Sequence, residues 1–346
     1  MQSLLISLRP RATRPGSLLI AFFMTLMLLL AACGSSTTAG GTPTTGGTSK
    51  LTIAFVMGAE ADPFFKAMKI GAEADAAQGV NLIWQGDPSV YSPATQIPYV
   101  DQVLAQHPSG LVLIPTNPDA LQPEVTKATA MNIPVINVDT HVADLSSVLS
   151  FITGDNTDGG MKAADSMATA VHYQDGQSYQ VVVGLTSATS TTNVARLDGF
   201  KQEITTKYPG IHIVDVGYSQ SQASVANTNV SNWLTKYPHL NGIFAIDGTN
   251  ATGAAAALQA KGLVGKVALV GYDAYPANVA LLKQGVFTAL IAQDPATEAR
   301  MAVDDFVAYF KQNRSAAGII SKVTIPNVLL TANTSAADLQ KYTYPS

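Results

Sequence analysis

Apolar, β-rich runs alternate with helical patterns along most of the chain from residue 51 onward. Many of these runs are continuously apolar, which is typical of strands buried on both faces of a parallel sheet. The predicted strands are Leu51–Met57, Val80–Gln85, Leu111–Pro115, Pro134–Val138, Val148–Thr153, Gln180–Leu185, Ile211–Gly217, Gly242–Ile246, Lys266–Gly271 and Phe287–Ala292. The predicted helices are Phe64–Gln78, Gly160–Val171, Asn193–Tyr208, Thr249–Lys261 and Thr297–Lys311.

Strands that alternate with helices predict an α/β fold with doubly wound parallel sheets. The 297 residues from Lys50 onward are too many for one small core and indicate two domains or one large one. The ten predicted strands fit two sheets of about five strands better than one sheet.

The first 32 residues have the pattern of an export signal. Arg9, Arg11 and Arg14 give a basic start, and the uncharged apolar run 18–30 is shorter than a membrane span. The run ends in Leu-Ala-Ala before Cys33, the only cysteine, and resembles a bacterial lipoprotein signal in which that cysteine is acylated. Residues 33–50 would then be the lipidated cysteine and a flexible Gly/Ser/Thr linker. An uncleaved signal anchor is the alternative.

Composition narrows the classes of function. Charged residues are 13% of the chain and the net charge is −4, so no basic surface for nucleic acid is indicated. With Cys33 used for the anchor, the remaining chain has no disulfide and depends on its core. The five histidines are scattered without metal-ligand spacing, and no Gly-x-Ser-x-Gly motif is present. We therefore expect no metal, no cofactor and no enzymatic activity.

Polar and aromatic residues follow the predicted strands, at the sheet edge where ligands bind in open α/β folds. They are Asp62, Phe64, Phe65, Asp139, Asp247, Tyr272, Asp273 and Gln293, together with Arg196 near the start of a helix. Carboxylates, an amide and a guanidinium can bind the hydroxyl groups of a sugar. Aromatic rings can contact the apolar face of its ring.

Each of these residues also has a purely structural interpretation. An aspartate after a strand often caps a helix, and this alternative stays open for every one of them. The phenylalanines can be ordinary core residues, and Arg196 can belong to a surface ion pair. Asp155-Asn156, before Gly159-Gly160, fits a helix cap better than a metal loop.

Six motifs in this order resemble type I periplasmic binding proteins, in the ribose-binding-like branch that serves sugar ABC transporters. They are Asp62-Pro63-Phe64-Phe65, Val135-Ile136-Asn137-Val138-Asp139, Arg196-Leu197-Asp198-Gly199-Phe200, Gly242-Ile243-Phe244-Ala245-Ile246-Asp247, Val270-Gly271-Tyr272-Asp273 and Ile291-Ala292-Gln293. The resemblance covers residues 51–330 and implies that the polar and aromatic residues named above contact a sugar.

The chain departs from the family pattern at several positions. Thr140-His141 follows Asp139 where the family often has arginine, and Ile114 replaces an asparagine. An aromatic wall is missing near Ser221, where Tyr218 is a substitute. Roles for Trp84 and Tyr91 at the cleft stay open, and so does the identity of the sugar.

The resemblance also implies an architecture and partners. Two lobes would be joined by a three-strand hinge, the first comprising 51–153 and 294–321 and the second 154–293 and 322–346. A monosaccharide or polyol would bind between them, and an ABC permease would receive it from a lipid-anchored monomer outside the cytoplasmic membrane. A sugar-sensing module for a chemoreceptor or kinase is an alternative. A glycosidase and a repressor's effector domain fit the residues and the export signal less well.

Overall fold

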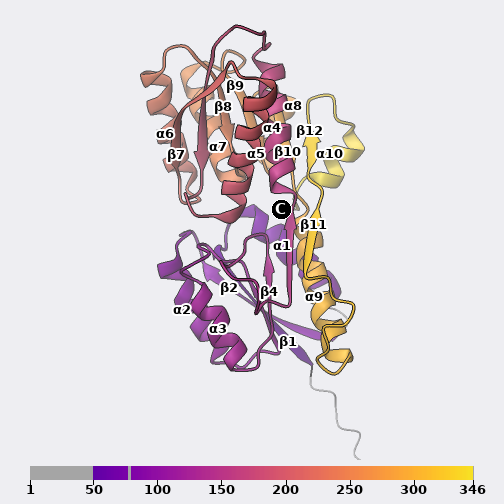
Figure 1. Ribbon diagram of the computed structural model, residues 1–346. Coiled ribbons are helices and arrows are strands. Elements are labelled where there is room, and N and C mark those ends of the chain that lie inside the picture. Colours follow the sequence, from indigo (N-terminus) through magenta and orange to yellow (C-terminus); the bar gives the residue numbers. More distant parts are fainter. Residues whose placement is uncertain (1–49, 77–78, 346) are drawn as a thin grey trace, which may run out of the picture. The chain divides into compact units, whose positions relative to one another are not determined.

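Two six-stranded sheets, each with helices on both faces, form the part of the chain that the computed structural model describes, residues 50–76 and 79–345 (Figure 1). The α/β fold with two parallel-sheet lobes predicted from the sequence is therefore confirmed. The expected signal segment, Cys33 and the linker up to residue 49 lie outside the described residues.

The first sheet has the strand order β11-β5-β4-β3-β1-β2, and all of its neighbouring strands are parallel. Its strands are β1 (Leu51–Ala59), β2 (Val80–Asp87), β3 (Gly110–Leu113), β4 (Val135–Val138), β5 (Ser150–Gly154) and β11 (Lys322–Ile325). Helices α1 (Pro63–Ala76) and α9 (Pro295–Lys311) pack together on one face, and α2 (Pro93–Leu104) and α3 (Gln122–Ala130) cover the other. We call this sheet and its helices the first lobe.

The second sheet repeats this order as β12-β10-β9-β8-β6-β7, with only β12 antiparallel to its neighbour. Its strands are β6 (Tyr179–Leu185), β7 (Ile211–Tyr218), β8 (Leu240–Ala245), β9 (Ala268–Tyr272), β10 (Ala289–Ala292) and β12 (Val328–Leu330). Helices α4 (Asn156–Ala170) and α5 (Thr191–Lys207) pack on one face, and α6 (Ala223–Lys236) and α7 (Gly248–Lys261) on the other. With α8 (Pro276–Lys283) and α10 (Ala336–Tyr342), these elements are the second lobe.

Continuous apolar strands and small helix residues account for the core. Every residue of β3 and β10 is buried, as their continuously apolar sequences predict, and every residue of β4 is buried as well, including the polar Asn137. The alanine-rich α7 lies so close to α6 that a Cβ on Gly253 would come within 2.5 Å of the Ala223 carbonyl oxygen. Burial of these apolar side chains is the main force that holds each lobe together.

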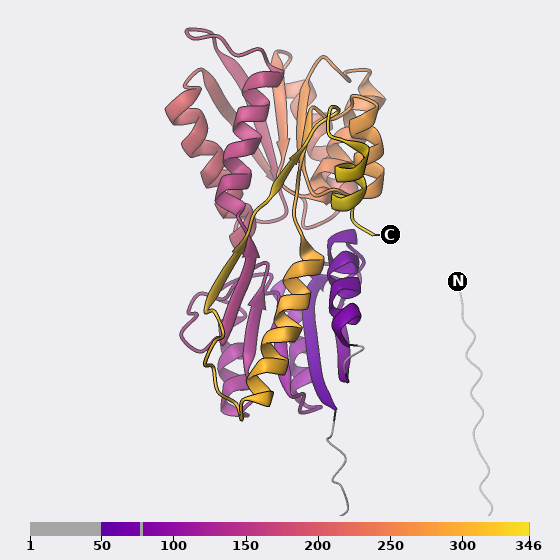
Figure 2. The same cartoon turned by 90° about the vertical axis from the view of Figure 1, so that its right-hand side faces the viewer.

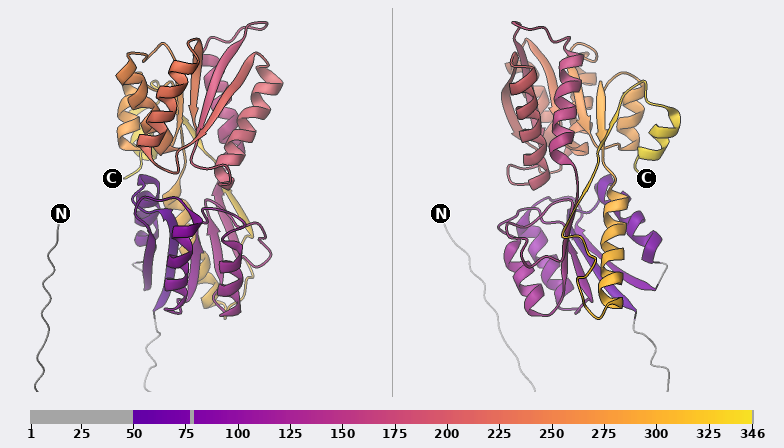
Figure 3. Two further views of the ribbon diagram at one scale, coloured as in Figure 1. Left: turned by 90° about the vertical axis from the view of Figure 1, so that its left-hand side faces the viewer. Right: turned by 45° about the vertical axis from the view of Figure 1, so that its right-hand side comes forward.

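The chain passes between the two sheets three times. The crossings lie at Asp155 between β5 and α4, at 293–294 between β10 and α9, and at 326–327 between β11 and β12. Figure 2 shows the last of these as the yellow segment near the end of the chain, and α9 beside the first sheet. In Figure 3 the C-terminal α10 lies beside the second lobe.

The third crossing corrects one expected boundary. Strand β11 pairs in parallel with β5, so residues 322–325 belong to the first sheet rather than to the second lobe. The sequence patterns did not predict β11 or β12, because both are short and partly exposed. They also did not predict α2, α3, α6, α8 or α10. Within the described part of the chain, no helix has the length and apolar character needed to span a bilayer.

Candidate functional site

A cavity with about 50 Å³ of space for water-sized molecules is lined by residues of both lobes. This space is smaller than the usual volume of small-molecule sites, about 300–1,000 Å³. Eight of the nine residues predicted from the sequence line it, and these are Asp62, Phe64, Phe65, Asp139, Arg196, Asp247, Asp273 and Gln293. The topology explains the convergence, because Asp139, Asp247, Asp273 and Gln293 follow closely after β4, β8, β9 and β10 at the carboxyl edges of the sheets.

Asp273 is held by three donors from separate parts of the second lobe. Its Oδ2 accepts a hydrogen bond from the Gly248 backbone N–H at 2.8 Å. Its Oδ1 accepts one from Gln293 Nε2 at 2.7 Å and another from the Tyr344 hydroxyl at 2.9 Å. The carboxylate is 3% exposed and its backbone φ is +66°. Asp273 is therefore fixed in place by the protein itself.

Asp247 combines a structural role with its place in the cavity wall. It is the N-cap of α7, where its Oδ1 accepts the Asn250 backbone N–H at 2.8 Å. Its Oδ2 accepts hydrogen bonds from the Thr186 hydroxyl at 2.8 Å and Asn250 Nδ2 at 2.7 Å. Burial raises the pKa of this carboxyl. The helix-cap interpretation and the binding-site interpretation thus apply to the same residue.

Asp62 links the two lobes. It lies in the loop between β1 and α1, and its carboxylate accepts hydrogen bonds from two hydroxyls of the second lobe, Thr249 at 3.1 Å and Tyr275. The Phe64 backbone N–H donates to it as well, at 2.9 Å. Burial raises the pKa of Asp62 to about 6, although the hydrogen bond from Tyr275 opposes that shift.

Asp139 differs from the other three carboxylates. Among the described residues, no donor makes a hydrogen bond to its side chain and no cation forms an ion pair with it. It is 8% exposed, and its φ of +59° is in the left-handed region. Burial raises its pKa to about 7, while the charge of Arg196 acts in the opposite direction.

Arg196 projects from α5 and is 2% exposed. Its Nε donates to Asn156 Oδ1 at 2.8 Å and its Nη1 to the Ile246 carbonyl at 3.0 Å. Burial by itself would lower its pKa, but Tyr272 and the facing carboxylates hold the pKa above its usual value. The guanidinium therefore stays charged in the cavity wall.

Tyr272 is the predicted site residue that does not line the cavity. It is fully buried, and the Arg196 guanidinium lies 3.9 Å from the centre of its ring. Tyr272 is the last residue of β9 and packs in the second-lobe core, whereas Asp273 follows the strand and lines the cavity. The Tyr272 ring therefore contacts the Arg196 guanidinium and does not line the cavity.

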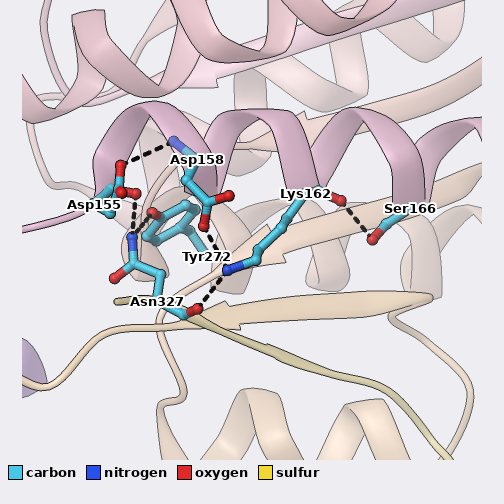
Figure 4. Close-up of polar contacts among 6 residues, drawn as sticks. All are labelled: Asp155, Asp158, Lys162, Ser166, Tyr272 and Asn327. Atoms are coloured by element: carbon cyan, nitrogen blue, oxygen red, sulfur yellow. Dashed lines mark hydrogen bonds and ion pairs between the residues drawn. The ribbon is translucent and has the colours of Figure 1, made fainter. Parts of the chain in front are cut away.

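Tyr272 also connects this region to two crossings of the chain (Figure 4). Asn327, in the third crossing, donates through Nδ2 to the Tyr272 hydroxyl at 2.6 Å and to the Asp155 carbonyl in the first crossing at 2.9 Å. Lys162 donates to the Asn327 carbonyl at 2.8 Å and pairs with Asp158 at 2.5 Å. Asp155 caps α4, as the sequence predicted, by accepting the Asp158 N–H at 3.1 Å.

Gln293 lies in the second crossing. Its Nε2 donates to Asp273, whereas its Oε1 is buried without a hydrogen-bond partner. A Cβ on Gly154 would lie 3.2 Å from this oxygen and 2.9 Å from Asn327 Oδ1, which also has no partner. Gly154 therefore lets all three crossings approach closely.

Aromatic rings form the apolar part of the cavity wall. Phe64 and Phe65 lie edge to face with ring centroids 5.4 Å apart, and both also belong to the hydrophobic core. Tyr91 of the first lobe and Tyr275 of the second lobe complete the wall. The second-lobe aromatic residue expected near Ser221 is thus supplied by Tyr275, from the loop after β9.

Sequence reasoning missed several lining residues. They are Thr186, Ser190, Thr192, Asn193, Ser221 and Tyr275, and Tyr91 had been left open. Most lie in loops or at the starts of helices, where no strand pattern marks them; the Tyr-Asp-Ala-Tyr-Pro run after β9 was the one available signal for Tyr275.

The remaining open residues lie elsewhere. Trp84 stacks on Phe55 at 5.0 Å, Tyr218 is 47% exposed outside the cavity, and Ile114 is fully buried. The Thr140 hydroxyl donates to the Pro115 carbonyl at 2.8 Å, and a ring nitrogen of His141 lies 2.7 Å from the Val142 carbonyl oxygen. Within the described ranges, no group of three or more histidine, cysteine, aspartate and glutamate residues is arranged to hold a metal ion.

Known proteins share both the sequence and the fold. A family model for the periplasmic binding protein domain matches residues 53–314. The D-ribose/D-allose-binding protein of Pseudomonas aeruginosa is 30% identical over 260 residues, which cover 72% of this chain and 79% of that protein. The ribose import binding protein of Escherichia coli is 31% identical over 258 residues, covering 73% and 83%.

A solved structure agrees with these relatives. An ABC transporter solute-binding protein from Agrobacterium vitis, bound with α-D-tagatopyranose, superposes with a TM-score of 0.79 at 30% identity, covering 86% of this chain and all of that one. The match spans both lobes and the motifs that line the cavity. The chain therefore belongs to the periplasmic binding protein family, in its type I, ribose-binding-like branch, and is a solute-binding protein rather than an enzyme.

Proposed function

We propose that this protein is the extracytoplasmic substrate-binding component of a sugar ABC importer, and that it binds a monosaccharide or similar polyol in the cavity between its lobes. The observation that carries the proposal is the convergence of four carboxylates, one guanidinium, two amides and four aromatic rings on one cavity. The ribose and allose relatives and the tagatose-bound neighbour support the same class of ligand.

The polar and aromatic residues of the wall have complementary roles in this proposal. Each sugar hydroxyl donates one hydrogen bond and accepts others, which suits carboxylate acceptors beside the donors of Arg196 and Gln293. The C–H face of the sugar would lie against Phe64 and Phe65 on one side and Tyr275 on the other. The proposed sugar contacts are the eight lining residues predicted from the sequence. Tyr272, the ninth predicted residue, would support Arg196 instead of contacting the sugar.

Binding would be coupled to movement at the three crossings. A ligand that contacts both lobes favours the arrangement in which they are close together, and so shifts the population toward it. The hydrogen bonds from Thr249 and Tyr275 to Asp62 already join the lobes without a ligand. In this proposal an ABC permease recognises the closed form, and the protein acts as a monomer.

A thermal-shift screen tests the proposal on the purified protein. Pentoses, hexoses and their polyols are supplied well above micromolar concentrations, and binding is measured as a rise in the unfolding temperature. A ligand at 100 times its dissociation constant stabilises the folded state by about 2.7 kcal/mol. Failure of every carbohydrate and polyol to raise that temperature would exclude the proposed function.

Membrane attachment is a separate part of the proposal. Acylation of Cys33 would anchor the protein in the membrane. More than one acyl chain would be needed, because a single chain gives only marginal attachment. In cell fractionation, Cys33→Ser should move the protein from the membrane fraction to the soluble extracytoplasmic fraction. Retention of the variant in the membrane fraction would exclude the lipid anchor and leave sugar binding untouched.

A further inference from the structure

The charges on the cavity wall are unbalanced. The cavity is lined by Asp62, Asp139, Asp247, Asp273 and Arg196, and no lysine or histidine is among its lining residues. Four buried carboxylates next to one guanidinium repel one another, and burial makes each negative charge more costly. A neutral sugar leaves this imbalance in place.

Glu298, the other buried acid nearby, does not restore the balance. It lies in the first turn of α9, is fully buried, and neither of its carboxylate oxygens has a hydrogen-bond partner. Burial, followed by the charge of Asp139, raises its pKa well above the usual range. Glu298 is an acid and supplies no positive charge, so it does not offset the carboxylates of the cavity wall.

Three of the four lining carboxylates are satisfied by the protein. Asp62, Asp247 and Asp273 each accept three hydrogen bonds from named donors, as described above. Asp139 accepts none among the described residues, although it is more than nine-tenths buried. A buried polar group without a partner costs about 1–3 kcal/mol, and more if it is charged.

The backbone keeps Asp139 in this position. Its own N–H donates to the Ile152 carbonyl at 2.9 Å, and its carbonyl accepts the Thr153 hydroxyl at 2.7 Å. These bonds hold a left-handed conformation that a residue other than glycine adopts at some cost. The protein thus fixes in the cavity wall a carboxylate that has no partner among the described residues, which leaves it available to a ligand.

We propose that the ligand carries a protonated amino group that pairs with Asp139, so that the substrate class is an amino sugar or amino polyol. This inference rests on the proposed function, because it assumes a hydroxylated ligand in the same cavity. The ammonium group supplies up to three hydrogen-bond donors, one of which Asp139 can accept. Its positive charge also offsets the excess of carboxylates in the cavity wall. Arg196 and the three satisfied aspartates then contact the hydroxyl groups of the ligand.

Isothermal titration near neutral pH with matched ligands tests this inference. Each set contains a neutral hexose, its 2-amino-2-deoxy counterpart and the N-acetylated form, for the glucose, mannose, galactose and allose series. We expect the amine to bind at least about tenfold tighter than both neutral members in at least one series. The N-acetylated member controls for the added bulk, because it has no positive charge.

Two variants test whether the preference for the amine depends on Asp139. Asp139→Asn should reduce the amine-to-neutral affinity ratio at least about tenfold. Asp198→Asn removes one charge from an exposed site outside the cavity and should leave that ratio unchanged. Unfolding temperatures of both variants establish that they are folded.

The outcomes separate the two proposals. Tighter binding of neutral members in every series overturns the amine inference and leaves the sugar-binding function standing. An amine preference that survives Asp139→Asn overturns the role of Asp139. No binding by any member of any series overturns the amine inference, and the thermal-shift screen with pentoses, hexoses and polyols decides separately whether the sugar-binding function stands.

Discussion

Asp139 and Asp273 occupy equivalent places in the two lobes but have opposite surroundings. Each directly follows a parallel strand, each has a left-handed backbone, and each donates its N–H to the next strand, to Ile152 at 2.9 Å and to Ile291 at 2.8 Å. Asp273 has three protein donors, whereas Asp139 has none among the described residues. Similar local structure therefore does not determine whether a carboxylate supports the fold or is left for a ligand.

The difference between these residues comes from elements that only one lobe has. The C-terminal segment supplies Tyr344 to Asp273, and the second crossing supplies Gln293. At Asp139 the first lobe provides no side chain in the corresponding positions. The second lobe thus has a preorganised acceptor, and the first lobe has one that is incomplete without its ligand.

The largest expected effect is loss of stability in Asp273→Ala. The substitution leaves the Gly248 N–H, Gln293 Nε2 and Tyr344 hydroxyl buried without an acceptor. At about 1–3 kcal/mol for each of the three unsatisfied groups, the free energy of unfolding should fall by at least about 3 kcal/mol. Urea unfolding monitored by circular dichroism measures this loss.

Asp139→Ala is the matched control for that experiment, because it removes a carboxylate that has no protein donor. It should cost less than about 1 kcal/mol or be stabilising. Equal losses of stability in the two variants would show that the contrast between the lobes is wrong.

The pH dependence of stability should distinguish the lobes next. Burial raises the pKa of Asp139 to about 7, so the ligand-free protein retains a proton there that the unfolded chain loses near pH 4. The resulting stabilisation is complete below about pH 4 and is lost as the pH rises through about 7. Asp139→Asn should therefore be more stable than the wild type by about 1–3 kcal/mol at about pH 8.

Charged and titratable groups around Asp139 also affect its pKa. Arg196 lowers its pKa, and Asp273 and Asp62 raise it, while Tyr91 and Glu298 lie nearby. Asp62, with a pKa of about 6, contributes a slope of the same sign and remains in the variant. Thermal unfolding at a series of pH values should therefore show that the stability of Asp139→Asn falls less steeply with pH than that of the wild type. An unchanged slope would contradict the unpartnered state of Asp139.

A smaller loss of stability is expected for a substitution at Tyr272, the residue before Asp273. Tyr272→Phe keeps the ring below Arg196 and removes the hydroxyl that accepts from Asn327 Nδ2. Loss of this hydrogen bond should cost about 1 kcal/mol and weaken ligand binding only a few-fold. Chemical denaturation and titration with the best ligand of the screen measure both quantities.

Gly159→Ala provides a test of that contact by double substitution. A Cβ at Gly159 would lie 2.0 Å from the Tyr272 hydroxyl oxygen, so the single variant should be clearly destabilised. In the Tyr272→Phe background the clash is partly relieved, and Gly159→Ala should cost less. Additive effects of the two substitutions would mean that the Tyr272 hydroxyl does not occupy this position.

The predictions from sequence succeeded where a local pattern carries the information. All ten predicted strands overlap strands of the structure, because strands buried on both faces have continuous apolar sequences. The pattern was weak for β11, whose residues are partly exposed, and for α2, which has Pro98 in its interior. The strand β11 was missed because it is short and partly exposed, and α2 was missed because Pro98 interrupts its helical pattern.

The sequence by itself determined the α/β fold and placed most of the polar cavity residues, because parallel strands end at a common edge and the residue after each strand must lie there. It did not distinguish Tyr272, the last residue of β9, from Asp273, which follows the strand and lines the cavity. Only the tertiary structure decided which carboxylates have donors. The donors to Asp62 and Asp273 include Tyr275, 213 residues away from the first, and Tyr344, 71 residues away from the second, and no local pattern connects residues so far apart.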